Sequence, residues 1–321
     1  MKIKLITPAK KFSKNGNRTT ALRWARILRD LGHQVDIAVN YNGEKTDLMV
    51  ALHAWRSADS IIIYKNVYSD GPLLVALTGT DINSYIHSDP SLTMGSMELA
   101  DFLICLHDLV SDIIPEKFQD KLRVIYQSAP ASSQKQNTRK AYFDICLMGH
   151  LRDVKDPMRG ALALRDMPKN SRLRLIHLGK AHNKSWEIKA RAEMLRNPRY
   201  LWKGEKAGWE VRKELSRTKL MMISSRSEGG ANVISEALVA GVPVIASRIN
   251  GNIGMLGKDY LGFYSVGDEK SLRDLLVKCE NDYSFLSKLT KSCRIRSKLF
   301  DLSEEKLRWK KLLSEVEFLS K

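Results

Sequence analysis

Short apolar segments alternate with segments whose apolar residues recur at helical spacing along the first part of the chain. Residues 3–6 form an apolar run that predicts a buried strand, and apolar positions from Ala21 to Leu31 predict a helix that ends at Gly32. Further strands are predicted at residues 33–39, 47–52, 60–64, 73–77, 102–106 and 124–126. This alternation is typical of a parallel sheet covered by helices.

A polar stretch of small residues, 129–140, interrupts the alternation and has the composition of a linker. The pattern then restarts, with strands predicted at residues 143–148, 173–178, 200–202, 220–224 and 243–246, and a helix at 302–319. We therefore expect an α/β protein of two doubly wound, Rossmann-like domains, residues 1–139 and 140–300, that face each other across a cleft. Residues 301–321 would form a closing helix. The length of 321 residues agrees with two domains, because a single hydrophobic core usually stops growing at roughly 250–300 residues.

The formal net charge of +17 is concentrated in the second part of the chain. Residues 1–140 hold 18 lysines and arginines against 14 acids, whereas residues 141–321 hold 35 against 22. Such an excess suits nucleic acid, an anionic membrane surface, a phosphate-bearing small molecule, or a solvated surface without a specific partner. The sequence has no helix-turn-helix, zinc-finger or aromatic RNA-binding signature, so we expect no nucleic-acid partner.

The cysteines and the apolar segments bear on the cellular setting. The four cysteines show no short repeated spacing and no paired histidines, so we expect neither a metal site nor a disulfide scaffold. No segment approaches the ~20 apolar residues that cross a bilayer, and the first residues do not resemble a secretory signal. We expect a cytoplasmic protein without integral membrane association. The sequence leaves its oligomeric state open.

Residues 224–237 carry the most informative chemistry. They follow a predicted strand, pass through small residues and enter a predicted helix. Such a turn directs backbone N–H groups and the positive end of the helix at one point, which suits a diphosphate. Glu228 precedes the helix and Glu236 lies about two turns later, so each carboxylate can accept hydrogen bonds from sugar hydroxyls.

Residues 228–247, EGGANVISEALVAGVPVIAS, resemble the two-glutamate motif of the large retaining GT-B glycosyltransferase family. The resemblance implies that Glu228 contacts the donor sugar and that Glu236 binds the ribose hydroxyls. It also implies that backbone N–H groups of the turn hold the diphosphate, the candidates being Gly229, Gly230, Ala231 and Asn232. A structural strand-turn-helix with incidental acids is the alternative.

A second group of polar residues follows the predicted strand 143–148. The family has a Gly-Arg-Leu turn there, followed by a lysine. In this chain His150 stands where the arginine is expected, Arg152 comes two residues later, and Lys155 keeps its place. Cations can stabilise the charge that builds on a leaving diphosphate without a metal. We expect Lys155 and Arg152 to do so beside His150; a surface position is the alternative for Arg152.

Three loops of the first domain follow predicted strands. By resemblance to the family, Gly16 and Asn17 are expected near the donor phosphate, because a small residue lets the backbone come close. A surface turn is the alternative for both residues. The acceptor-side candidates are His53, Arg56, Thr80 and Asp81. Asp81 could orient a sugar hydroxyl or cap the next helix, and a lone histidine such as His53 is more often structural.

Several of these segments together resemble one subgroup, the selenosugar synthases of selenoneine biosynthesis, over about residues 3–300. The two-glutamate motif alone does not single out this subgroup; His150 in place of arginine and the run 247–254 do. The resemblance implies transfer of a hexosyl unit, typically N-acetylglucosamine, from a UDP-sugar to selenophosphate, with no further cofactor. Selenophosphate is already ionised, so little help from a general base is needed. A GT-B enzyme that acts on a lipid or polysaccharide, and a nucleic-acid-binding protein without catalysis, are the alternatives.

Overall fold

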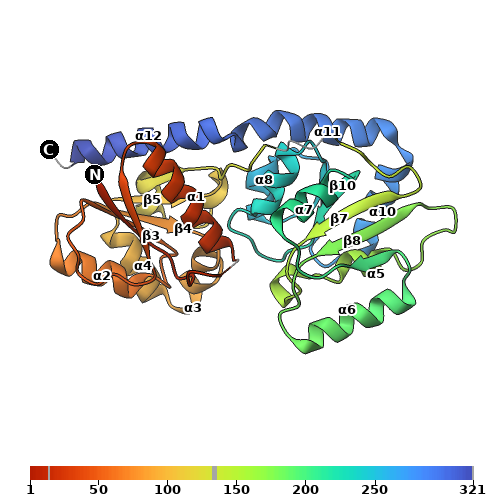
Figure 1. Ribbon diagram of the computed structural model, residues 1–321, viewed down its shortest axis with the longest axis horizontal. Helices are drawn as coiled ribbons and strands as arrows, with labels where there is room; N and C mark the ends of the chain where they lie inside the picture. Colours follow the sequence, from red (N-terminus) through yellow and green to blue (C-terminus); the bar gives the residue numbers. More distant parts are fainter. Residues whose placement is uncertain (14, 132–135, 320–321) are drawn as a thin grey trace. The chain divides into compact units, whose positions relative to one another are not determined.

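The computed structural model describes residues 1–13, 15–131 and 136–319 (Figure 1). Residues 132–135 of the predicted linker therefore lie outside the described residues. The chain divides into two compact units. The first comprises Met1–Ser128, Glu228–Asn232 and Leu302–Lys321, and the second comprises Ala129–Ser227 and Val233–Asp301.

The first unit is built on a sheet of six parallel strands in the order β2-β1-β3-β4-β5-β6. The strands are β1 (Lys2–Ile6), β2 (Gln34–Ala38), β3 (Leu48–Leu52), β4 (Leu73–Leu77), β5 (Phe102–Cys105) and β6 (Leu122–Val124). The main helices are α1 (Gly16–Asp30), α2 (Ala58–Val67), η1 (Asp81–Tyr85), α3 (Ile86–Ser88), α4 (Pro90–Leu99) and α12 (Leu302–Leu319). Short helical turns η2 (Asp108–Val110) and η3 (Glu116–Lys121) precede β6. The strand order reverses between β1 and β3, and in open parallel sheets ligands bind beyond the carboxyl ends of the strands at such a switch point.

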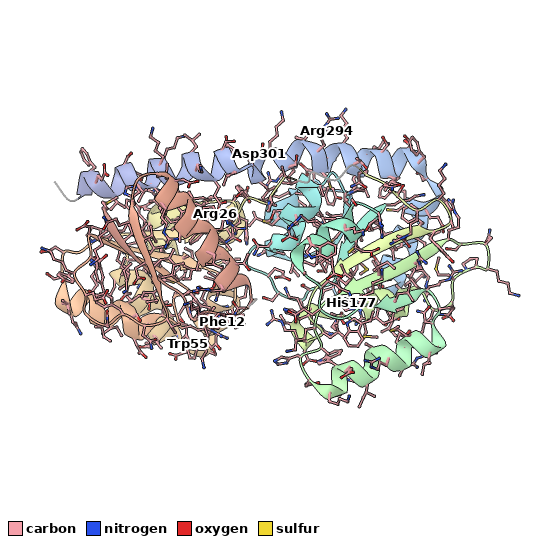
Figure 2. The ribbon with its side chains drawn as sticks, viewed as in Figure 1. Phe12, Arg26, Trp55, His177, Arg294 and Asp301 are labelled. Atoms are coloured by element: carbon pink, nitrogen blue, oxygen red, sulfur yellow. The ribbon has the colours of Figure 1, made fainter. Side chains whose placement is uncertain are left out.

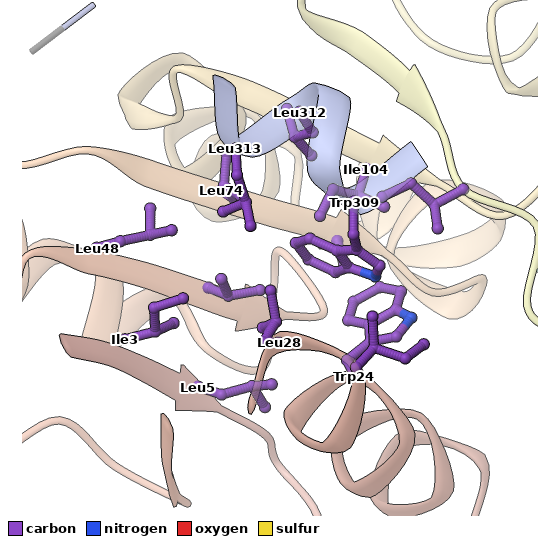
Figure 3. Packing of buried hydrophobic residues seen from close by; sticks show 14 of the residues in the cluster. Ile3, Leu5, Trp24, Leu28, Leu48, Leu74, Ile104, Trp309, Leu312 and Leu313 are labelled. Atoms are coloured by element: carbon purple, nitrogen blue, oxygen red, sulfur yellow. The ribbon is translucent and has the colours of Figure 1, made fainter. Parts of the chain in front are cut away.

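The core of the first unit lies on both faces of this sheet. Every residue of β3 and β4 is buried, as expected for parallel strands covered on both sides. On one face, Trp24 of α1 meets Trp309 of α12 edge to face, with ring centroids 5.1 Å apart (Figure 3). Leu312 and Leu313 of α12 join the same cluster. The C-terminal helix therefore belongs to the core of the first unit.

The second unit repeats the plan with six parallel strands in the order β12-β11-β10-β7-β8-β9. They are β7 (Phe143–Met148), β8 (Leu173–Leu178), β9 (Tyr200–Trp202), β10 (Leu220–Ile223), β11 (Val244–Ser247) and β12 (Phe263–Tyr264). The helices are η4 (Asp153–Lys155), α5 (Arg159–Ala163), α6 (Lys184–Arg196), α7 (Gly208–Leu215), α8 (Asn232–Val239), α9 (Asn250–Leu256), α10 (Glu269–Asn281), α11 (Tyr283–Ser297) and η5 (Lys298–Phe300). This is the strand order of the Rossmann fold, with its switch point between β7 and β10.

One predicted strand is wrong. Residues 60–64 lie within helix α2, where Ile61 and Tyr64 are buried while Ile62 and Ile63 are 41% and 43% exposed. A short apolar run does not by itself distinguish a strand from a buried helix, and here the spacing of three residues between the buried side chains is helical. Among the described residues, no helix combines the length and the apolar character needed to cross a membrane.

Candidate functional site

In the second unit, the turn after β7 is tied to the end of β10 across the switch point. The Ser224 hydroxyl donates to the carbonyl oxygens of Lys155 and Asp156, each at 2.9 Å. The backbone N–H of Arg226 donates to the carbonyl oxygen of Val154 at 2.9 Å. These bonds fix the backbone that carries Lys155, which is partly buried, whereas the Arg152 side chain is exposed.

Two histidines support this turn, and their bonds define their protonation. His177 lies in β8 of the second unit (Figure 2). Its buried side chain donates from Nε2 to Gly149 O at 2.9 Å and accepts the Tyr200 hydroxyl at Nδ1 at 2.9 Å. Burial lowers the pKa of His177 to about 4, so the ring is neutral at neutral pH. His150 Nδ1 accepts the backbone N–H of Lys180 at 3.1 Å. A backbone N–H can only donate, which leaves the proton of neutral His150 on Nε2.

His150 and Lys155 come together at one small cavity of about 10 Å³. Its lining also includes Gly149, Pro157, His177, Ser224 and Ser225. Burial lowers the pKa of His150, Glu205 opposes that change, and the charges of Arg152, Lys155 and Lys180 lower the pKa further. Neutral His150 therefore presents an N–H donor beside a lysine ammonium. That arrangement can stabilise negative charge on phosphate oxygens.

The segment Glu228–Asn232 follows β10 and groups with the first unit. There Gly229 lies against Gly79, so closely that a Cβ on Gly229 would come 2.3 Å from the carbonyl oxygen of Thr78. Gly230 has a φ of +140° and could not gain a Cβ without meeting Leu106 at 2.6 Å. The glycines predicted to form the diphosphate turn are thus required by the backbone itself.

Two side chains of the first unit hold this segment. Asn83 Nδ2 donates to the carbonyl oxygen of Glu228 at 3.1 Å. The Arg23 guanidinium donates from both terminal nitrogens to Asn232 Oδ1 at 3.2 and 3.1 Å. Buried Glu305 of α12 accepts from Trp24 Nε1 at 2.8 Å and lies 3.4 Å from Arg23 Nε. Neither Arg23 nor Asn83 was predicted at the site, because each contacts a residue far away in sequence.

Helix α8 begins at Asn232 and carries Glu236 in its second turn. Glu236 is half-buried and lines a cavity of about 180 Å³ in the second unit. The other lining residues are Pro130, Gly208, Val211, Arg212, Leu215 and Ala240. The carboxylate therefore stands at the edge of a mostly apolar space with one guanidinium.

The run after β11 also contacts the end of β10. The Ser247 hydroxyl donates to Ser225 O at 2.5 Å, and Asn252 Nδ2 donates to the carbonyl oxygen and the hydroxyl of Ser247 at 2.9 and 3.1 Å. All three side chains are buried. The start of the run 247–254 thus supports the backbone at the end of β10, shortly before the glycine turn.

In the first unit, Asp81 connects the loops after β3 and β4. Its carboxylate is fully buried and accepts four backbone N–H groups, from Ala54 (3.2 Å), Thr78 (3.0 Å), Gly79 (2.7 Å) and Ile82 (3.2 Å). Both oxygens are therefore occupied by the protein. This placement favours a structural role for Asp81 over the orientation of a sugar hydroxyl.

His53 and Thr80 are brought together across those two loops. His53 is buried with a φ of +77°, an uncommon conformation for a residue with a side chain. Its Nε2 lies 2.8 Å from Thr80 Oγ1, and its Nδ1 accepts the backbone N–H of Arg56 at 3.2 Å. Burial lowers the pKa of His53, while the charge of Asp81 opposes that change. The Arg56 side chain and Thr80 are exposed.

Gly16 and Asn17 form the first turn of α1 and not a free loop. Asn15 caps this helix, its side chain accepting the backbone N–H of Arg18 at 3.0 Å. Gly16 is exposed, and a Cβ added there would meet nothing within 4 Å. The backbone around Gly16 therefore has open space, and the contact of both residues with a donor phosphate stays a prediction. Within the described ranges, no group of three or more His, Cys, Asp or Glu side chains could hold a metal ion.

Solved structures share this architecture over almost the whole chain. HepE from Anabaena, in complex with UDP, has 16% sequence identity and a TM-score of 0.78, covering 98% of this chain and 100% of that one. A glycosyltransferase from Rickettsia africae (14% identity, TM-score 0.77) covers 100% and 98%, respectively. Sucrose-phosphate synthase from Thermosynechococcus elongatus (15% identity, TM-score 0.76) covers both chains completely. These similarities confirm the predicted GT-B fold.

Sequence comparison assigns the family. No curated protein sequence matches this chain significantly. The family model described as glycosyl transferases group 1 matches residues 128–296, which is more than half of the chain. That range contains the turn after β7, the segment Glu228–Asn232 and helix α8. The chain therefore belongs to the group 1 family of glycosyl transferases.

Proposed function

We propose that this glycosyltransferase transfers N-acetylglucosamine from its UDP form to selenophosphate and so forms a 1-selenosugar. The bond between sugar C1 and the β-phosphate oxygen breaks, and its electron pair leaves with UDP. Selenium supplies the electron pair of the new C1–Se bond, and water cleaves the Se–P bond to release phosphate. The observation that carries this proposal is the segment from β10 into α8, which puts Glu228, the glycine turn and Glu236 at the switch point of a parallel sheet.

The donor is a UDP-sugar in this proposal. HepE, of similar fold, has been solved with UDP and with UDP-glucose. An apolar cavity of about 150 Å³ can hold benzene, so the space of about 180 Å³ beside Glu236 has room for a pyrimidine ring. With the pyrimidine ring in this space, Glu236 accepts hydrogen bonds from the ribose hydroxyls and Glu228 contacts the donor sugar.

The leaving diphosphate is stabilised by the group after β7. Lys155 supplies a positive charge, and Arg152 a second one from an exposed position. Neutral His150 donates from Nε2, because Lys180 N–H occupies its Nδ1. Charge grows on the β-phosphate as the C1–O bond breaks, so these groups stabilise the transition state more than the bound substrate.

The acceptor is the finer part of the proposal and rests on the subgroup resemblance. Selenophosphate is ionised at neutral pH, which agrees with acceptor-side loops where His53 and Asp81 are engaged by the protein. A nucleophile that is already an anion needs positioning and not deprotonation. The residues that distinguish the subgroup lie after β7 and β11: His150 accepts the backbone N–H of Lys180, and Ser247, held by Asn252, donates to the carbonyl oxygen of Ser225 at the end of β10.

The test is direct. Purified protein is incubated with UDP-N-acetylglucosamine and enzymatically generated selenophosphate, and the products are read by mass spectrometry for the isotope pattern of selenium on a sugar. Release of UDP with a selenosugar supports the proposal. Lys155→Ala should lose product, whereas Lys258→Ala, an exposed lysine of the same unit, should not. Turnover only with a lipid or polysaccharide acceptor would contradict the selenium chemistry and leave the family assignment standing.

A further inference from the structure

The two acceptor-side loops of the first unit hold a hydrogen-bond chain whose direction can be derived. The chain runs from the backbone N–H of Arg56 through the His53 ring to the Thr80 hydroxyl. It lies beyond the carboxyl ends of β3 and β4, and β3 borders the switch point of the sheet. The loops are fixed relative to each other, because Asp81 accepts N–H groups from both.

The direction of this hydrogen-bond chain follows from the backbone N–H of Arg56, which can donate but cannot accept. The Arg56 N–H can only donate, so His53 Nδ1 must be unprotonated and the neutral ring carries its proton on Nε2. Nε2–H then donates to Thr80 Oγ1 at 2.8 Å, and this oxygen acts as an acceptor. The hydroxyl proton of Thr80 is left to point at another partner. Within the described part of the chain, Thr80 Oγ1 has no second partner, and it does not cap the helix that follows.

Three further observations place this hydroxyl where a ligand can reach it. Thr80 is exposed although His53 is buried. Trp55 stacks on Tyr85 with ring centroids 3.9 Å apart and an angle of 4° between the rings, and Trp55 Nε1 donates to Asp89 at 2.8 Å. The neighbouring residue, Gly79, lies against Gly229 of the diphosphate turn. Thr80 is therefore an exposed residue that directly follows the glycine in contact with Gly229.

We propose that Thr80 is the hydrogen-bond donor for an anionic oxygen of the acceptor, and that His53 is a positioning residue that fixes the direction of its hydroxyl. The inference rests on the proposed function in one respect, that the acceptor is a phosphate-type anion. A donor held in one direction favours an oxygen with only lone pairs over one that must itself donate. The uncommon backbone conformation of His53 is explained by this task, since it puts both ring nitrogens into fixed bonds.

The variants separate the hydroxyl from the shape of the side chain. Thr80→Ser keeps the hydroxyl, and Thr80→Val keeps the shape without it. His53→Asn tolerates the left-handed backbone and removes Nε2. Thr290→Val, on the exposed surface of α11, makes the same chemical change outside the site. The probe is inorganic thiophosphate, titrated calorimetrically into the full chain in the presence of UDP.

Thr80→Val should raise the dissociation constant of thiophosphate roughly tenfold or more, because a hydrogen bond to a charged group is lost. Affinity for UDP should not change. Thr80→Ser and Thr290→Val should resemble wild type. His53→Asn should weaken binding, and the double variant should bind no more weakly than Thr80→Val, because the two residues act as one unit. Unchanged binding in Thr80→Val, additive effects, or no thiophosphate binding by wild type would overturn the inference.

The kinetic arm separates this inference from the proposed function. If wild type forms selenosugar and Thr80→Val leaves the KM for selenophosphate unchanged, the role of Thr80 is wrong and the proposed function stands. If wild type forms no selenosugar while thiophosphate binding depends on the Thr80 hydroxyl, the proposed function is wrong and the anion site stands.

Discussion

Ser224 and Lys155 are joined by a hydrogen bond of 2.9 Å from the serine hydroxyl to the lysine carbonyl oxygen. The bond connects the ends of β10 and β7, the two strands at the switch point of the second sheet. It acts on the backbone of Lys155, so the position of that residue depends on the buried hydroxyl of Ser224. Ser224→Ala should therefore lower kcat several-fold while the protein loses only about 0.5–1.5 kcal/mol of stability. Steady-state kinetics and denaturant unfolding of the same variant check both values.

Lys155→Ala should lower kcat by about two orders of magnitude and change the KM for the donor little. Its charge matters most when the diphosphate leaves, so the loss falls on the transition state. Steady-state kinetics with UDP-N-acetylglucosamine measures both constants, with Lys258→Ala as the matched control. Kinetics that match wild type would remove Lys155 from the site.

Glu236→Ala should raise the KM for the donor with a smaller effect on kcat. A hydrogen bond to a charged carboxylate is worth roughly 1.5–3 kcal/mol, which corresponds to about a tenfold to hundredfold change. Glu236→Gln keeps one acceptor oxygen and should lie between wild type and Glu236→Ala. A donor KM unaffected by either change would place the ribose elsewhere.

Asp81→Asn should destabilise the first unit strongly. The new amide group would face backbone N–H groups that now donate to the carboxylate, leaving at least one buried donor without a partner. The expected loss is about 1–3 kcal/mol, measured by denaturant unfolding. Asp70→Asn, at an exposed position, serves as the control and should leave the unfolding midpoint unchanged.

Stability should fall as the pH is lowered from about 6.5 towards 4, in part because of His177. The pKa of this ring is about 4 in the folded protein and near 6.5 when unfolded, so the unfolded chain binds more protons in that window. The contribution of His177 to stability therefore rises with pH and is fully present above about 6.5, the pKa of the ring in the unfolded chain. His177→Gln should make the dependence shallower by up to roughly 1.4 kcal/mol per pH unit. The exposed His182→Gln should keep the wild-type slope.

Much of the fold follows from the sequence because buried parallel strands are continuous apolar runs. The strands β7, β8 and β9 have the predicted bounds, and α12 spans the predicted residues 302–319. The run at residues 60–64 shows where such prediction fails. All its apolar residues look alike in the sequence, and only the structure shows that Ile61 and Tyr64 are the buried ones, on one face of a helix. The two-residue strand β12 carries too short a pattern to be predicted.

Of the candidate site, motifs that are local in sequence could be found, and contacts between distant residues could not. The turn of glycines before α8 and the group after β7 are each contiguous, so both could be named as candidates from the sequence. His177 lies within a strand and gives no signal, yet it holds the Gly149 carbonyl. The role of Asp81 required the structure as well, because Ala54 belongs to another loop. Arg23 reaches Asn232 only after folding.

The central claim is that the turn from Gly229 to Asn232 binds the phosphates of a UDP-sugar. Calorimetric titration of UDP into wild type, Gly230→Ala and Gly241→Ala tests it most directly. Both glycines have positive φ, +140° and +73°, so both substitutions strain the backbone, but only Gly230 lies in the turn. We expect wild type and Gly241→Ala to bind UDP with similar affinity and folded Gly230→Ala to bind it at least tenfold more weakly. Equal binding by all three proteins, or no binding by wild type, would contradict the account.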